Sequence, residues 1–183
     1  MKIILLRHEE RYFDIGFFSS LTDNGIIRAN TSLITELSYI KIDCIFSSPF
    51  LRTLQTIYPY SKKKNKKVKI EYGLYEYIHN PYFLLFQWYH TTNDIEDVDL
   101  KSIINKNYKS IVNKDDFSIL ENENNLEKRI KKFFDYLLKD YKNKTVLLVT
   151  HKGVINKIKD MYIKKTDMDE DFDTGMLLVH TIN

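Results

Sequence analysis

The stretch Ile3-Ile4-Leu5-Leu6-Arg7-His8 decides the fold, because it has the length of a buried strand and ends abruptly in charged residues. A near-copy, Val146-Leu147-Leu148-Val149-Thr150-His151, comes late in the chain. Two short apolar runs that each end in a histidine fit an open α/β sheet, in which ligands bind outside the carboxyl ends of the strands. Either histidine alone would simply close a strand at the surface, but the pair indicates a shared site.

The composition is that of a soluble globular protein. A chain of 183 residues, 43% hydrophobic and 29% charged, can bury one full core, so we expect a single domain over residues 1–183. The net charge of +3 is too mild to indicate nucleic acid. The lone cysteine, Cys44, cannot form an internal disulfide, and no run is long enough for a signal peptide or a membrane span. We therefore expect a cytoplasmic protein without a membrane association, and the oligomeric state stays open.

Strands alternate with helices along most of the chain. Further strands are predicted at residues 43–47, 68–72, 145–150 and 176–181. Helices are predicted from the N-cap Thr22 to about residue 37, then at 50–58 with an end near Pro59, at 126–141 and at 153–163. This alternation predicts a three-layer sandwich of class α/β, with a mostly parallel sheet flanked by helices.

Residues 77–122 break the alternation and are predicted to be an insertion that caps one end of the sheet. Their aromatic residues could line a substrate pocket or stack bases, but packing of the insertion itself is favoured. These aromatic residues are Tyr82, Phe83, Phe86, Trp88 and Tyr89. The lysine run 62–67 is predicted to be a solvated loop, and binding of nucleic acid or anionic lipid is the less favoured alternative.

Arg52 lies near the start of the second predicted helix, where an arginine opposes the helix dipole. A bound anion would resolve this conflict, because helix N-termini and guanidinium groups both suit phosphate. His151 likewise stands between a strand and a helix. We therefore predict that Arg7, Arg52, His8 and His151 converge on one phosphoryl group, which a neutral histidine can attack directly.

A proton donor for the leaving oxygen is needed as well. Glu76 lies just past a strand end, and its neighbours Tyr75 and Tyr77 are expected to raise the pKa of its carboxyl group by desolvation. Glu71 is the alternative, although it is expected inside the strand. The remaining histidines show no ligand spacing, so we predict no metal and no cofactor.

Taken together, these residues resemble the pattern of the histidine phosphatase (phosphoglycerate mutase-like) superfamily. The matching pieces are Leu6-Arg7-His8, Leu21-Thr22 with Gly25 and Ala29, Ser47-Ser48-Pro49 with Arg52, Gln55 and Thr56, Leu74 with Glu76, and the run from Val149 to Ile155. Their order along the chain is the family's. The resemblance implies that His8 is the phosphorylated nucleophile, that Arg7, Arg52 and His151 bind phosphate, that Glu76 donates the proton, and that no metal is required.

Two residues depart from the family pattern. Glu9 stands where a glycine usually follows the nucleophile, and Asp14 stands where mutase-type members have an asparagine that contacts phosphate. The first reading is a phosphatase that acts on a small phosphomonoester through phosphohistidine. A phosphoglycerate mutase-type phosphotransferase and a weakly active protein that binds phosphorylated ligands stay open as alternatives.

Overall fold

The centre of the molecule is a five-stranded sheet with the strand order β3-β2-β4-β1-β5. The computed structural model describes residues 1–14, 16–81, 90–116, 120–163 and 172–182. The strands are β1 (Lys2–Arg7), β2 (Cys44–Ser47), β3 (Val68–Ile70), β4 (Thr145–Thr150) and β5 (Leu177–Thr181). β1 to β4 run parallel, whereas β5 lies antiparallel to β1. The mostly parallel sheet predicted from the sequence is confirmed.

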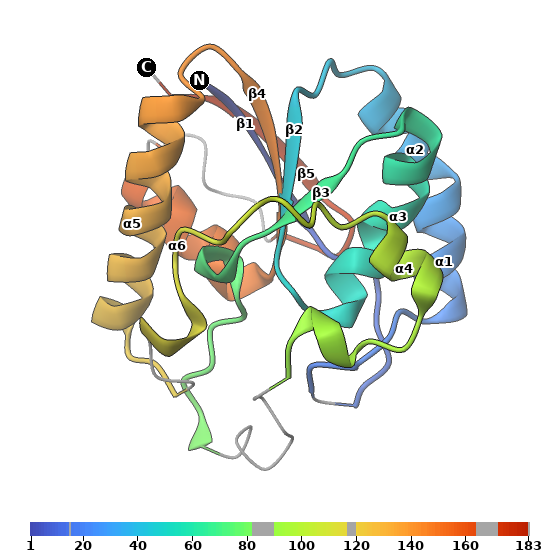
Figure 1. Cartoon of the computed structure of the whole chain (residues 1–183), viewed down its shortest axis with the longest axis horizontal. Coiled ribbons are helices and arrows are strands. Elements are labelled where there is room, and N and C mark those ends of the chain that lie inside the picture. The colour runs from blue at the N-terminus through green and yellow to red at the C-terminus, as the bar shows by residue number, and fades with distance from the viewer. Residues whose placement is uncertain (15, 82–89, 117–119, 164–171, 183) are drawn as a thin grey trace.

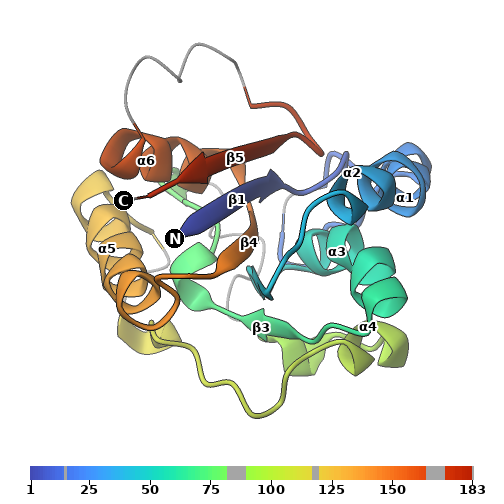
Figure 2. The same ribbon diagram turned by 90° about the horizontal axis from the view of Figure 1, so that it is seen from above.

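Helices cover both faces of this sheet, as Figures 1 and 2 show from two directions. One face carries α1 (Asp23–Asn30), α2 (Ser32–Ser38), α3 (Leu51–Lys64) and α4 (Val98–Ser102), and the other carries α5 (Glu123–Asp140) and α6 (Lys152–Tyr162). Alternate residues of β1 enter different cores, with Ile4 in one and Ile3 in the other. A central strand buried on both faces needs an unbroken apolar sequence, which explains the run that opens the chain.

The first predicted helix begins where the sequence indicates. The Thr22 hydroxyl accepts a hydrogen bond from the Gly25 backbone N–H at 3.1 Å and so caps α1. Gly25 cannot be replaced without a shift, because a Cβ there would lie 2.2 Å from the carbonyl oxygen of Glu10. This close approach holds the segment after β1 against the first helix.

The predicted end of the second helix near Pro59 is wrong, because α3 continues to Lys64 with Pro59 inside it. A proline in a helix interior removes one hydrogen bond and costs about 3 kcal/mol. Burial of Ile57 and Tyr60 on either side of Pro59 offsets this cost, and Asn65 ends the helix in a left-handed conformation. The first three lysines of run 62–67 are therefore the last helical turn, where cations suit the dipole, rather than a loop.

The third strand is also shorter than predicted, since β3 ends at Ile70. Glu71 is the N-cap of a short 3-10 helix, Tyr72–Leu74, and its side chain accepts a hydrogen bond from the Gly73 N–H. The chain thus turns sharply after β3 and carries Glu76 back over the end of the sheet. Glu71 is a capping residue and not part of the strand.

Part of the predicted insertion, residues 77–122, packs into the domain. Residues 103–105 lie along the free edge of β3, where the Val68 N–H donates to the Ile103 carbonyl and the Asn105 N–H donates to the Val68 carbonyl. The aromatic run 82–89 lies outside the described residues. That residues 77–122 cap the site stays a prediction. Within the described part of the chain, no helix combines the length and the apolar character needed to cross a membrane.

Candidate active site

The sheet register brings the two histidines together. Arg7 in β1 pairs with Thr150 in β4, so His8 and His151 are the next residues of adjacent parallel strands. Their ring centroids lie 5.3 Å apart in an edge-to-face arrangement, and both side chains are buried. The two imidazoles therefore occupy one small volume at the carboxyl edge of the sheet, where α/β folds bind their ligands.

His8 is held with one ring nitrogen fixed. Its Nδ1 lies 2.8 Å from the carbonyl oxygen of Glu9, and a carbonyl only accepts, so Nδ1 carries the proton. Burial, together with the positive charge of Arg52 and the neighbouring His151, keeps the pKa of His8 well below its ordinary value. A neutral imidazole protonated at Nδ1 has a bare Nε2, which is the form needed for nucleophilic attack.

His151 is oriented from both sides. Its Nε2 lies 2.9 Å from the hydroxyl of Ser48, and its Nδ1 lies 3.1 Å from the Glu76 carboxylate. The carboxylate favours a proton on Nδ1, so we assign Nε2 as the acceptor from Ser48. Burial lowers the pKa of His151 to about 4, against the raising effect of Glu76. His151 is therefore neutral near pH 7 in the free protein.

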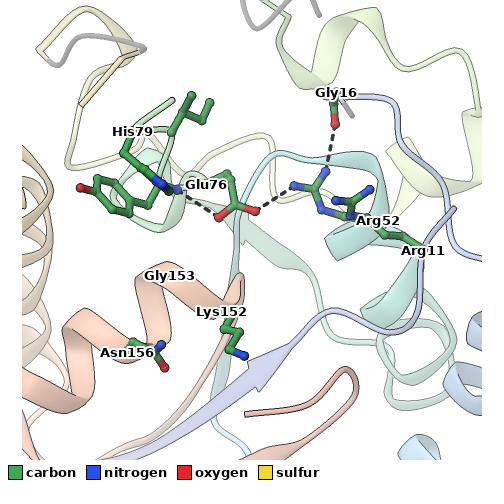
Figure 3. Close-up of a pocket in the computed structure, with 10 residues that line it drawn as sticks. Arg11, Gly16, Arg52, Glu76, His79, Lys152, Gly153 and Asn156 are labelled. Atoms are coloured by element: carbon green, nitrogen blue, oxygen red, sulfur yellow. Dashed lines mark hydrogen bonds and ion pairs between the residues drawn. The ribbon is translucent and has the colours of Figure 1, made fainter. Parts of the chain in front are cut away.

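Arg52 and Glu76 form an ion pair beside the histidines, with the Arg52 Nη2 3.2 Å from the Glu76 Oε2 (Figure 3). A second guanidinium nitrogen, Nη1, donates to the Gly16 carbonyl at 3.0 Å, and the ring of Phe50 lies under the guanidinium. Burial lowers the pKa of Arg52 to about 10, although the Glu76 charge raises it. Arg52 remains a cation at neutral pH.

Glu76 does not have the raised pKa expected from its aromatic neighbours. Burial raises its pKa, but His151 and Arg52 outweigh burial and hold the pKa well below its ordinary value. The expected direction is therefore wrong for the free protein, because two polar partners and not Tyr75 and Tyr77 decide the charge of this carboxyl group.

A cavity of about 360 Å³ opens beside this ion pair. Its walls include Arg52 and Glu76, and residues from other segments complete them: Arg11, Gly16, Tyr77, Ile78, His79, Lys152, Gly153 and Asn156. Figure 3 shows the guanidinium of Arg11 beside that of Arg52, on the same side of Glu76. Three cationic side chains and one carboxylate thus surround the cavity, which makes it suitable for an anion.

The structure therefore brings together four of the five predicted site residues: His8, Arg52, Glu76 and His151. One guanidinium nitrogen of Arg7, Nη1, donates to the carbonyl of Phe172 at 2.8 Å, in the segment before β5. Among the described residues, Arg7 is not part of the cavity wall, and neither are the buried His8 and His151. Its predicted contact with phosphate stays a prediction.

Three residues were missed as parts of this site. Ser48 orients His151, and Thr56 accepts a hydrogen bond from the Glu9 N–H at 2.9 Å, although both belong to the motif pieces noted in the sequence. Arg11 enters the cavity wall from the loop after β1. Its position three residues after His8 was the only signal available, because which way a loop arginine points depends on the turn that follows.

His8, Glu76 and His151 could also hold a cation, because one donor atom from each lies within 4.8 Å of the others. The Glu76 Oε2 that faces His151 also contacts Arg52. A cation at this oxygen would meet the positive charge of the guanidinium. These side chains therefore suit an anion bound to Arg52 better than a metal ion bound to the Glu76 carboxylate.

The comparison with protein families agrees with this geometry. The model of the histidine phosphatase superfamily (branch 1) matches residues 4–170. The chain belongs to the histidine phosphatase superfamily. No curated protein matches the chain.

Solved structures of several phosphatases resemble the fold at low sequence identity. The ecdysone phosphate phosphatase from Bombix mori has 16% identity and a TM-score of 0.70, with 97% of this chain and 88% of that chain covered. For the alpha-ribazole phosphatase from Shigella flexneri the values are 20% and 0.67, with coverage of 100% and 91%. The phosphoserine phosphatase from Entamoeba histolytica has 21% identity and a TM-score of 0.63, with coverage of 97% and 89%. At these identities the similarity shows the shared fold.

Proposed function

We propose that the chain is a metal-independent phosphatase that hydrolyses a small phosphomonoester through a phosphohistidine intermediate on His8. The observation that carries this proposal is the buried pair of neutral imidazoles, 5.3 Å apart, beside an arginine and a carboxylate. Phosphoryl transfer needs a positioned nucleophile and fixed positive charge around the equatorial oxygens, and these residues supply both.

In the first step, the Nε2 of His8 attacks phosphorus, the bond to the leaving oxygen breaks, and Glu76 gives its proton to that oxygen. In the second step, Glu76 takes a proton from water, the water oxygen attacks phosphorus, and the bond to Nε2 breaks. Inorganic phosphate leaves, and Glu76 and His8 return to their starting forms. Arg52 and His151 bind the transferred oxygens throughout.

Substrate binding has to change the charge of Glu76, because the free protein holds this group as a carboxylate. An entering phosphate takes the place of Glu76 as the partner of Arg52. The substrate's negative charge then raises the pKa of the carboxyl group, so that it binds the proton it later donates. When Arg52 changes its partner from Glu76 to the phosphate, Glu76 becomes protonated and can act as the general acid. The same change brings the phosphate to the two buried imidazoles.

A panel of phosphomonoesters with a chelator present tests the proposal. We expect the wild type to release inorganic phosphate and to form an acid-labile, alkali-stable phosphoryl adduct, and His8→Ala to do neither. His180→Ala is the matched control, because His180 pairs with Ile3 at the opposite end of β1. Turnover that needs a metal and survives His8→Ala would contradict the proposal.

One observation favours a second candidate, a weakly active protein that binds phosphorylated ligands. In the free protein Glu76 is ionised and Arg52 already has a carboxylate partner, so neither group is ready for catalysis. This candidate predicts that inorganic phosphate binds with an affinity that depends on Arg52, while the whole panel stays unhydrolysed. Calorimetric titration of wild type and Arg52→Met with phosphate, run beside the panel, distinguishes the two candidates.

A further inference from the structure

The carboxylate of Glu9, which stands where the family usually has a glycine, is buried in a contact with Arg28 and Gly175. The Glu9 side chain is 1% exposed, and its Oε2 lies 3.3 Å from the Nε of Arg28 near the end of α1. Burial raises the pKa of Glu9, and Arg28 opposes this shift. Among the described residues, Glu9 is not part of the wall of the cavity beside Arg52. The carboxylate therefore faces Arg28.

Gly175 completes the contact from the C-terminal side. This residue has φ +72°, and a Cβ added to it would lie 2.2 Å from the Glu9 Oε1, so the carboxylate packs directly on its backbone. The Gly175 N–H lies 3.2 Å from the carbonyl oxygens of both Arg7 and His8. Arg28 also reaches this segment, because its Nη2 donates to the Thr174 carbonyl at 3.3 Å.

The backbone of Glu9 meanwhile holds the nucleophile. Its carbonyl oxygen accepts the Nδ1–H of His8, and its N–H donates to the Thr56 hydroxyl. The same residue thus fixes the tautomer of His8 through its main chain and is itself fixed by Arg28 and Gly175 through its side chain. A rotation of the Glu9 backbone would remove the acceptor of the His8 Nδ1–H, and the His8 ring would then no longer hold its Nε2 in one direction.

We propose that Glu9, Arg28 and Gly175 form a clamp that positions His8, with Glu9 as a positioning residue for the nucleophile. The clamp joins the loop after β1, the end of α1 and the segment that leads into β5. It rests on the proposed function only for its kinetic consequences, since the state of the His8 ring can be measured without turnover.

The first test compares Glu9→Gln, which removes the charge and keeps the shape, with Arg28→Gln at the half-exposed end of the contact. We expect each to lower kcat with p-nitrophenyl phosphate by about tenfold, because small displacements of reacting groups are costly, while KM stays within about twofold. The double variant should be no slower than the slower single variant. Lys131→Gln, at an exposed ion pair on α5, is the control and should leave both constants unchanged.

Nitrogen-15 NMR of the histidine rings gives the readout that is independent of activity, with His8→Ala assigning the His8 signals. The wild type should show His8 protonated at Nδ1, and both clamp variants should show a mixture of tautomers in a folded protein. Unchanged His8 signals in both folded variants would overturn the proposal, as would a raised KM with an unchanged kcat. An inactive wild type would refute the phosphatase proposal, and the NMR would still decide the clamp.

Gly175→Ala supplies a second test in two backgrounds. In the wild type the new methyl group meets both the carboxylate and the unfavourable φ, whereas in Glu9→Gly it meets only the unfavourable φ. We expect a larger fall in melting temperature in the wild-type background. Equal falls would show that φ alone requires glycine and would overturn the contact between Glu9 and Gly175.

Discussion

Glu71 and Glu76 were alternative acids in the sequence, and the structure predicts opposite results for the same substitution at the two positions. Glu71 is fully buried and its two carboxylate oxygens accept hydrogen bonds from five donors. The donors are the N–H groups of Gly73, Ile111 and Val112 and the hydroxyls of Tyr108 and Ser110, at 2.5–3.2 Å. Glu76 instead contacts Arg52 and His151 beside the cavity.

Glu71→Gln should destabilise the fold, and its cost can be worked from these contacts. In its better orientation the amide oxygen keeps the Gly73 and Val112 N–H groups and the Ser110 hydroxyl, while the amide nitrogen faces the Ile111 N–H and the Tyr108 hydroxyl, of which only the hydroxyl can turn to accept. One buried N–H then lacks an acceptor, at about 1–3 kcal/mol, and the bonds that remain lose the assistance of the negative charge. The sum is about 3–5 kcal/mol, which corresponds to a fall in melting temperature of about 6–20 °C for a chain of this size.

Glu76→Gln keeps an amide oxygen that can accept from Arg52 but removes the negative charge that pairs with this buried guanidinium, so its melting temperature should fall too, and kcat is the quantity that separates the two variants. Its kcat should fall by about 10²–10⁴, because the amide cannot donate the proton. Glu71→Gln, assayed below its own melting temperature, should keep kcat within about threefold, because the hydrogen-bond partners of Glu71 are not residues of the cavity wall. Thermal denaturation with kinetics on both variants makes the comparison. A stable but inactive Glu71→Gln, or an active Glu76→Gln, would refute the assignment of roles.

The other predictions concern the candidate active site and the dependence of stability on pH. His8→Ala should lose both the phosphoryl adduct and turnover, as autoradiography after acid and alkali treatment would show. Arg52→Lys, which keeps the charge but not the planar fork, should lose about 10–100-fold in kcat/KM, and recovery of full activity would contradict a two-point contact with phosphate. The free energy of unfolding should begin to fall as pH drops below about 6.5, because His8 and His151 are held neutral in the folded state and bind protons more readily when unfolded. It should fall more steeply below about pH 4.5, where unfolding lets Glu76 bind a proton that the folded state resists, and urea titrations at several pH values measure both slopes.

The fold could be predicted from the sequence because its central strands are buried on both faces and therefore stand out as unbroken apolar segments. The runs that end in His8 and His151 are unbroken apolar segments, and two such strands can only be neighbours or near neighbours in one parallel sheet. The end of α3 could not be predicted in the same way. Local preference places a helix end at Pro59, but burial of the residues around it outweighs that preference, and burial is a property of the assembled core.

The location of the site residues could be predicted from the sequence, but their charge states could not. Glu76 was placed correctly near the strand ends, yet its pKa shifts in the direction opposite to the expected one, because its partners Arg52 and His151 come from distant segments. Glu9 illustrates the same point, since a carboxylate next to the proposed nucleophile His8 looks unfavourable until its contacts with Arg28 and Gly175 are known. A residue's own neighbours in sequence fix where its backbone goes, whereas its charge state depends on whatever the folded chain packs against it. Substitutions at Arg28 should therefore alter His8 chemistry even though no local pattern connects the two.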